Sequence, residues 1–158
     1  MERDNFIFKT HISFGIQSDT IELDIITKEL GIEPAKSSLK KGDTWVGKKT
    51  GKIYVRESNI WRIETEWTIL EDETVSHHIE YLKSILLPKI DILKKYKDSK
   101  ECYTSFWIWV ETDLAGIGLY LTDDELNFLH SIANYVHFSL LAKDPKEMDA
   151  EIKKKKKQ

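Results

Sequence analysis

The chain has 158 residues, of which 41% are hydrophobic and 32% are charged, so it is too apolar to be disordered and has the size of one ordinary domain. Its 24 basic and 27 acidic side chains give a formal charge of −3, and the lysine run at residues 153–157 leaves the remainder distinctly acidic. This balance argues against a nucleic-acid surface, and no apolar run approaches the roughly 20 residues that a bilayer crossing needs.

The single cysteine, Cys102, cannot form an internal disulfide, and the chain begins without the apolar segment of a secretory signal. We therefore expect a cytoplasmic protein. We also expect one α+β domain over residues 1–143. The polar, lysine-rich tail at residues 144–158 would then be a frayed helix or disordered.

The first third of the chain predicts a strand, a helix and a hairpin. Residues 5–16 alternate between apolar and polar side chains, which indicates a half-buried strand with His11 on its polar side. A helix with a period near 3.6 residues follows and ends at Gly31, which supplies a left-handed exit. Residues 44–55 predict a hairpin that turns through residues 48–51, and its few apolar side chains suit the edge of a sheet.

Residues 59–70 alternate as one long strand, so its apolar and charged side chains should lie on opposite faces. The apolar face would carry Trp61, Ile63, Trp67 and Ile69, and the charged face Arg62, Glu64 and Glu66. A long helix with an apolar stripe comes next. Pro88 stands in its middle and predicts a kink or a break.

Residues 102–121 predict a β-hairpin at the centre of the sheet. In its first strand Ile108 faces one way, while Trp107 and Trp109 face the other. The second strand, which ends at Leu121, would set Gly116 and Gly118 beside the two indole rings. A large ring that covers a neighbouring glycine limits the cost of having glycine in a strand.

Thr122 and Glu125 have the spacing of a capping box at the start of a last helix, and residues 136–142 form a closing strand. The buried stripe of this helix would be Leu126, Leu129, Ile132 and Ala133. The resulting order, β-α-β-β-β-α-β-β-α-β, predicts an α+β fold with a mostly antiparallel sheet and its helices on one face. The similar ends of the chain also suggest two ferredoxin-like βαβ halves.

Several short motifs resemble a bacterial family. They are Phe14-Gly15, the sequence IITKELGIEP at residues 25–34, the turn Lys41-Gly42-Asp43 and the strand segment Trp67-Thr68-Ile69. In this arrangement the chain is similar to the family catalogued as domain of unknown function 4279. The resemblance covers most of residues 6–142 and implies a compact bacterial α+β domain, compatible with partner binding. It assigns no catalytic or binding residue.

The sheet face opposite the helices should gather ionisable and aromatic side chains, if these strand parities hold. Tryptophan and arginine are frequent among residues that carry binding energy, because they bury much area and still make polar contacts. The candidate binding residues are His11, Arg62, Glu64, Glu66, Trp107, Trp109 and His137. The plain alternative is a solvated sheet face with cross-strand ion pairs.

A catalytic interpretation would use His11 or His137 beside Glu64 or Glu66 as acid and base, but no nucleophile motif accompanies them. The adjacent histidines at residues 77–78 lack the i, i+4 spacing of a metal-binding pair. We therefore predict no metal and no other cofactor, and we favour a binding protein over an enzyme.

The expected function is that of a non-enzymatic protein that recognises a protein partner through the mixed sheet face or the hairpin. An immunity protein of a toxin system is one concrete form, because an acidic domain would attract a basic toxin. The alternative is a small-molecule-binding or hydrolytic domain that uses the open face. We expect no nucleic-acid or membrane partner, and a monomer or weak homodimer. A third reading is assembly of copies through an edge strand or the C-terminal segment.

Overall fold

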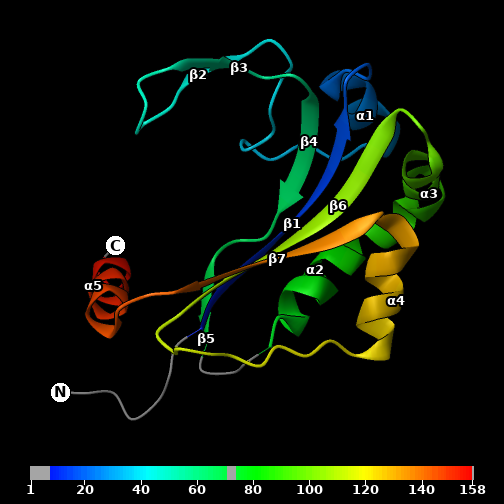
Figure 1. Ribbon diagram of the computed structural model, residues 1–158. Coiled ribbons are helices and arrows are strands. Elements are labelled where there is room, and N and C mark those ends of the chain that lie inside the picture. Colours follow the sequence, from blue (N-terminus) through cyan, green and yellow to red (C-terminus); the bar gives the residue numbers. More distant parts are fainter. Residues whose placement is uncertain (1–7, 71–73, 158) are drawn as a thin grey trace.

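Two long strands form the centre of the sheet in the computed structural model, which describes residues 8–70 and 74–157. Strands β1 (Phe8–Ser18) and β6 (Cys102–Thr112) pair antiparallel over their whole length. β4 (Asn59–Glu64) and β5 (Thr68–Leu70) lie on the other side of β1, and β7 (Tyr135–Ala142) runs parallel to β6 (Figure 1). The mostly antiparallel α+β fold predicted from the sequence is confirmed. The predicted residues 5–7 of the first strand lie outside the described residues.

The helices α1 (Leu23–Leu30), α2 (Ser76–Leu86), α3 (Ile90–Asp98) and α4 (Asp123–Ile132) cover one face of this sheet (Figure 1). Between α2 and α3 the chain forms a 3-10 turn, η1 (Leu87–Lys89), because Pro88 interrupts the helix as predicted. On the covered face Phe14, Phe106 and Trp61 have no exposed surface. These sheet residues form the hydrophobic core together with the apolar stripes of the helices.

Both predicted helix ends are confirmed. Gly31 ends α1 with a left-handed φ of 64°, and the Thr122 hydroxyl and the Glu125 carboxylate form the reciprocal capping box of α4. The inward stripe of α4 differs by one position: Leu126 is 49% exposed, whereas Phe128 is 5% exposed. Phe128 belongs to the buried stripe in place of Leu126. Its ring packs against the ring of Phe106 in the core, with the two centroids 5.8 Å apart.

The predicted central hairpin is wrong in its second half. The segment at residues 113–122 forms no strand, because β6 is already paired with β1 on one side and with β7 on the other. Ile117, Leu119 and Leu121 pack instead against the core as partly buried side chains of an extended connection. Gly116 therefore does not lie under an indole ring, and a Cβ atom at Gly116 would meet nothing within 4 Å.

The predicted single strand over residues 59–70 is divided into β4 and β5 by a bulge. Between their paired positions, three residues (65–67) face two residues of β1 (11–12). One extra residue is the count of a β-bulge, and it moves every following side chain to the opposite face. Ile69 therefore pairs opposite an open-face position of β1, and Trp67 contacts a ring on that face, although we predicted both beside Trp61.

The predicted hairpin exists, but it is not an edge of the main sheet. β2 (Thr44–Val46) and β3 (Ile53–Val55) form a separate two-stranded sheet that extends away from the body (Figure 1). We call residues 42–56 the arm. Its turn contains Gly51 with a positive φ of 64°, a conformation that glycine adopts without steric cost.

The C-terminal segment forms a helix, α5 (Pro145–Lys155), with the Asp144 side chain as its N-cap. Met148 is 1% exposed, so the helix is packed rather than solvated on all sides. Lys9 of β1 and Lys143 both contact the Glu151 carboxylate, at 3.0 and 2.7 Å. These ion pairs place α5 at the open-face end of the sheet.

The two ends of the chain differ in topology. In the second half, β6, α4 and β7 form a βαβ unit with parallel strands. In the first half, β1 and β4 flank α1 but pair antiparallel. The predicted likeness of the two halves therefore applies to element order and not to strand direction.

Candidate functional site

A row of aromatic rings crosses the sheet face opposite the helices. In spatial order its members are Trp67, His11, Trp109, Trp107, His137 and Tyr135. Neighbouring ring centroids are 4.7, 6.4, 5.4, 4.1 and 4.8 Å apart. The first five rings lie within 35° of their neighbours' planes, and Tyr135 meets His137 edge-on at 88°. We call these six side chains the ring row.

Strand register explains why the row is continuous. His11 of β1 is paired with Trp109 of β6, and Trp107 of β6 is paired with His137 of β7. Directly paired residues in a sheet have their side chains on the same face and within contact distance. Trp67 reaches His11 only because the bulge after β4 reverses its direction. The row thus extends from the bulge to β7.

Stacking determines what the row presents to a partner. The internal rings turn their faces to one another, and the ammonium group of Lys9 lies 4.8 Å from the Trp67 ring at one end. The outward parts are therefore ring edges. No described residue accepts a hydrogen bond from the indole N–H of Trp107 or Trp109, whereas the Trp61 indole donates to the Thr27 hydroxyl at 3.0 Å. Within the described chain, the row therefore offers indole donors that have no protein acceptor, beside apolar ring edges.

His11 is the most enclosed member of the row, with 8% of its surface exposed. Its Nδ1 lies 3.0 Å from the Thr65 carbonyl oxygen, which can only accept, so Nδ1 carries the proton and Nε2 the lone pair. Burial lowers the pKa of His11, and the Thr65 bond and the charge of Glu64 oppose that shift. No hydroxyl or thiol of the described chain donates to Nε2, so the pair of base and nucleophile that covalent catalysis needs is not formed.

The charged candidates flank the row on the β4 side. Glu64 is exposed and accepts a hydrogen bond from the Ser37 hydroxyl at 2.8 Å, while Arg62 donates to the Ser37 carbonyl oxygen at 3.2 Å. Glu66 lies in the bulge and is exposed. The loop that carries Ser37 therefore fixes the β4 border of the face.

The structure brings four of the predicted residues into direct ring contact and places the three charged ones beside them. Those in contact are His11, Trp107, Trp109 and His137. Sequence reasoning missed two members of the row. Trp67 was assigned to the opposite face, and Tyr135 was left outside a strand predicted to begin at residue 136. The break in alternation at Thr65-Glu66-Trp67 is the signal that could have located the bulge.

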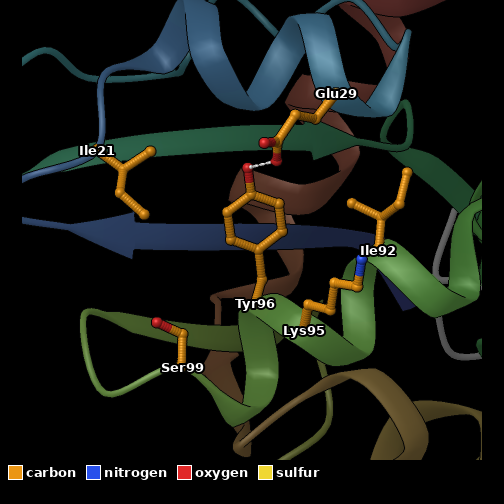
Figure 2. A pocket seen from close by; sticks show the side chains of 6 residues that line it. All are labelled: Ile21, Glu29, Ile92, Lys95, Tyr96 and Ser99. Atoms are coloured by element: carbon orange, nitrogen blue, oxygen red, sulfur yellow. Dashed lines mark hydrogen bonds between the residues drawn. The ribbon is translucent and has the colours of Figure 1, made fainter.

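A second candidate is a pocket of about 430 Å³ between α1 and α3 (Figure 2). It is lined by Ile21, Glu29, Ile92, Lys95, Tyr96 and Ser99. The Tyr96 hydroxyl donates to the Glu29 carboxylate across the pocket, and burial followed by this bond raises the pKa of Tyr96. The carboxylate is thus already engaged in joining two helices. We therefore interpret the pocket as a gap at the contact between two helices and not as a ligand site.

The adjacent histidines are also engaged within the fold. His77 and His78 approach the Thr68 hydroxyl through Nε2 at 2.9 and 3.0 Å. Across residues 8–70 and 74–157, no group of three or more His, Cys, Asp or Glu side chains is placed to bind a metal ion. Within the same ranges no helix is long and apolar enough to cross a membrane.

The fold and the ring row together define a small α+β protein with one sheet, helices on one side and aromatic edges on the other. The family model described as "Domain of unknown function (DUF4279)" matches residues 8–143. The chain therefore belongs to this family, as the motifs around residues 25–34 had indicated. The match runs from β1 to the end of β7. No curated protein and no solved structure matches the chain.

Proposed function

We propose that this chain is a non-enzymatic binding protein of a bacterial cytoplasm that recognises a protein partner through the ring row. The observation that supports this proposal is that Trp107 and Trp109 are only partly buried and that no described residue accepts a hydrogen bond from either indole N–H. Tryptophan at such a place can bury large area on binding and form a hydrogen bond in the same contact. The exposed carboxylates of Glu64 and Glu66 would surround this apolar centre with a charged rim.

Charge favours a basic partner. Residues 40–56 contain six basic and one acidic side chain and so have a net charge of +5. Because the whole chain has a net charge of −3, all the other residues together have a net charge of −8. A basic partner would be drawn to this remainder, because complementary charge speeds association. An immunity protein that neutralises a basic toxin is one concrete form of the proposal.

The arm is the competing docking element within the same proposal. Val46, Ile53 and Val55 are 60, 72 and 60% exposed, and Trp45 is 43% exposed. An isolated two-stranded ribbon buries little of its own apolar surface, so a partner could cover these side chains. Its positive charge, however, would repel the basic partner that the remainder favours.

The test compares the loss of one indole from each surface. Tagged wild-type protein, Trp107→Ala and Trp45→Ala would be incubated with extract of the native host, and captured proteins would be purified and titrated by calorimetry. We expect Trp107→Ala to weaken binding at least about tenfold, as hot-spot tryptophans do, and Trp45→Ala to leave it unchanged. The reverse pattern would move the docking surface to the arm. Failure to recover any protein that binds after purification would contradict the proposal.

Charge reversal gives a second variant that leaves the rings in place. Glu64 is exposed, so Glu64→Lys should fold normally and should slow association with a basic partner. For the immunity version, co-expression with the product of an adjacent gene should restore growth that this product alone prevents. If the Glu64→Lys variant and the Trp107→Ala variant each restore growth as well as the wild type does, the open face is not the surface that neutralises the toxin.

A small-molecule or hydrolytic function is favoured by one observation, the unprotonated Nε2 of His11 beside two indole rings. A substrate would have to move a neighbouring side chain to reach this atom, because His11 is only 8% exposed. Hydrolysis of 4-nitrophenyl acetate distinguishes the two functions. A binding protein should show the same slow rate for wild type and His11→Ala, whereas a rate that falls with this substitution would support catalysis.

A further inference from the structure

The β4 and β7 edges of the main sheet differ in whether another segment of the described chain covers their backbone. The outer side of β4 is covered by residues 35–41: Leu39 and Ile60 exchange backbone hydrogen bonds at 2.9 and 2.8 Å, and the Ala35 N–H donates to the Arg62 carbonyl oxygen at 2.7 Å. A covered edge cannot recruit another strand. The β4 edge is therefore closed to strand addition.

The outer side of β7 is bare within the described part of the chain. β7 is the terminal strand of the sheet and pairs there with β6 alone. Its sequence, YVHFSLLA, contains no acidic residue, lysine, arginine or proline over eight residues. Edge strands that must stay single usually carry charges, prolines or bulges, because these features block pairing with another chain. β7 has none of these protections.

Large apolar side chains remain exposed on both faces of this strand. Tyr135, Phe138, Leu140 and Leu141 are 41, 50, 55 and 51% exposed. Phe138 and Leu140 are paired with Ile108 and Val110, so they extend the core face of the sheet beyond the helices. Among residues 8–70 and 74–157, no segment covers the core face at this edge of the sheet.

We propose that β7 pairs antiparallel with β7 of a second copy of this chain, about a two-fold axis perpendicular to the sheet. Pairing centred on Ser139 sets Phe138 of each copy opposite the partner's Leu140 on the core face. Because of the two-fold symmetry this contact occurs twice, and each Phe138 and each Leu140 is covered by a side chain of the other copy. No charge faces a like charge along the strand, although the rest of the chain is acidic. Self-pairing is therefore favoured over pairing with a foreign strand of unrelated pattern.

The area available fits a weak dimer. Large side chains expose on the order of 200 Å² when free, so the four half-exposed ones would bring roughly 400 Å² per copy, or about 800 Å² in total. This area is below that of stable specific interfaces and is in the range of weak, transient contacts. A dissociation constant in the micromolar range is the expected consequence. Such an axis also keeps both open faces on the same side of one continuous sheet. This inference does not depend on the proposed function.

Sedimentation equilibrium of the wild type over a wide concentration range tests the pairing. We expect a monomer–dimer equilibrium, and for Phe138→Lys/Leu140→Lys a dissociation constant raised at least about tenfold, because four lysines would meet at the axis. Leu126→Lys is the matched control, since Leu126 is 49% exposed but lies on α4, and it should dimerise like the wild type. A wild type that stays monomeric at the highest concentration, or a double variant that dimerises unchanged, would overturn the proposal.

A cross-link locates the axis without disturbing the fold. Cα atoms directly opposite in an antiparallel pair are about 4.5–5.5 Å apart, which a disulfide can span. Ser139→Cys should form a covalent dimer under mild oxidation. Ser84→Cys, at an exposed position of α2, should not, and the native Cys102 is 3% exposed and does not compete. Equal cross-linking of the two variants would show random collision and would contradict pairing through β7.

Discussion

The apolar side chains on the two faces of the sheet are shielded from water in different ways, although the same strands form both faces. On β6, Phe106 and Ile108 point into the helix layer and have no exposed surface. On the opposite side of the same strand, Trp107 and Trp109 remain partly exposed and are stacked on each other. The core face depends on a second layer of structure, whereas the open face depends on rings that cover one another. Stability and recognition should therefore respond to different substitutions.

The largest predicted difference is between one tryptophan from each face. Trp61→Ala should lower the free energy of unfolding by about 4 kcal/mol, because it removes a fully buried indole and leaves a cavity. Trp109→Ala should cost about 1–2 kcal/mol, because it removes ring stacking from a partly exposed site. Urea denaturation measures both. Equal losses would show that the open face is as much a part of the core as the covered one.

Acid should weaken the covered face through His78, which is 3% exposed. Burial, followed by the neighbouring His77, lowers the pKa of His78 from 6.5 to about 4. The unfolded chain then takes up a proton at a higher pH than the folded chain, so stability is full above pH 6.5 and is lost as the pH falls towards 4. The loss from this group approaches about 3 kcal/mol.

Urea denaturation at steps between pH 7 and pH 4 measures this loss, and His78→Gln is the comparison. The variant lacks the titrating imidazole, so its free energy of unfolding should fall less over the same range. His11 and His77 contribute in the same direction, because burial lowers the pKa of each. A variant with the same pH slope as the wild type would show that other groups, these two histidines and carboxylates such as Glu151, cause the effect.

A smaller effect is expected at the start of α4, which helps to cover the core face. Thr122→Ala removes the hydroxyl that accepts from the Glu125 N–H at 3.2 Å, and should cost about 1 kcal/mol. Thr122→Ser keeps the hydroxyl and serves as the control. Thermal denaturation followed by circular dichroism compares the three proteins. A loss as large for serine as for alanine would mean that the methyl group, and not the cap, matters.

The smallest effect is expected where α5 meets the open face. Glu151 contacts Lys9 and Lys143, and hydrogen bonds from these lysines lower the pKa of Glu151. Glu151→Gln should cost less than about 1 kcal/mol, because the Glu151 side chain is 39% exposed. The loss should shrink further in high salt. Glu80→Gln, which breaks an exposed pair within α2, is the control and should show no measurable change.

The division into two faces was predictable because strand alternation has a fixed period of two. His11, Trp107 and Trp109 lie on one face as their parity required, and Ile12, Phe106 and Ile108 on the other. Helix ends were equally predictable, because glycine after α1 and the capping box before α4 act through local geometry. The family motifs were confirmed by the match over residues 8–143.

The errors arise where local pattern does not determine pairing. One inserted residue before Trp67 reverses its face, and the alternation shows this insertion only as a polar residue, Thr65, at a position where an apolar one is expected. Residues 117–121 alternate like a strand, yet an extended segment packed on the core needs the same alternation. The sequence could not show that both sides of β6 were already occupied. Sheet order is a long-range property that depends on the whole chain.

The arm has a consequence for how the chain opens. Its two strands are held by the stack of Trp45 on Tyr54, the Arg56 guanidinium over Trp45, and backbone bonds between Gly42, Asp43 and Arg56. None of these contacts involves the main sheet, so the ribbon can separate locally while the core stays folded. The lysines at residues 48–52 would then become substrates for trypsin. Limited digestion should nick the protein first at this turn and leave two fragments that remain associated through β1 and β4.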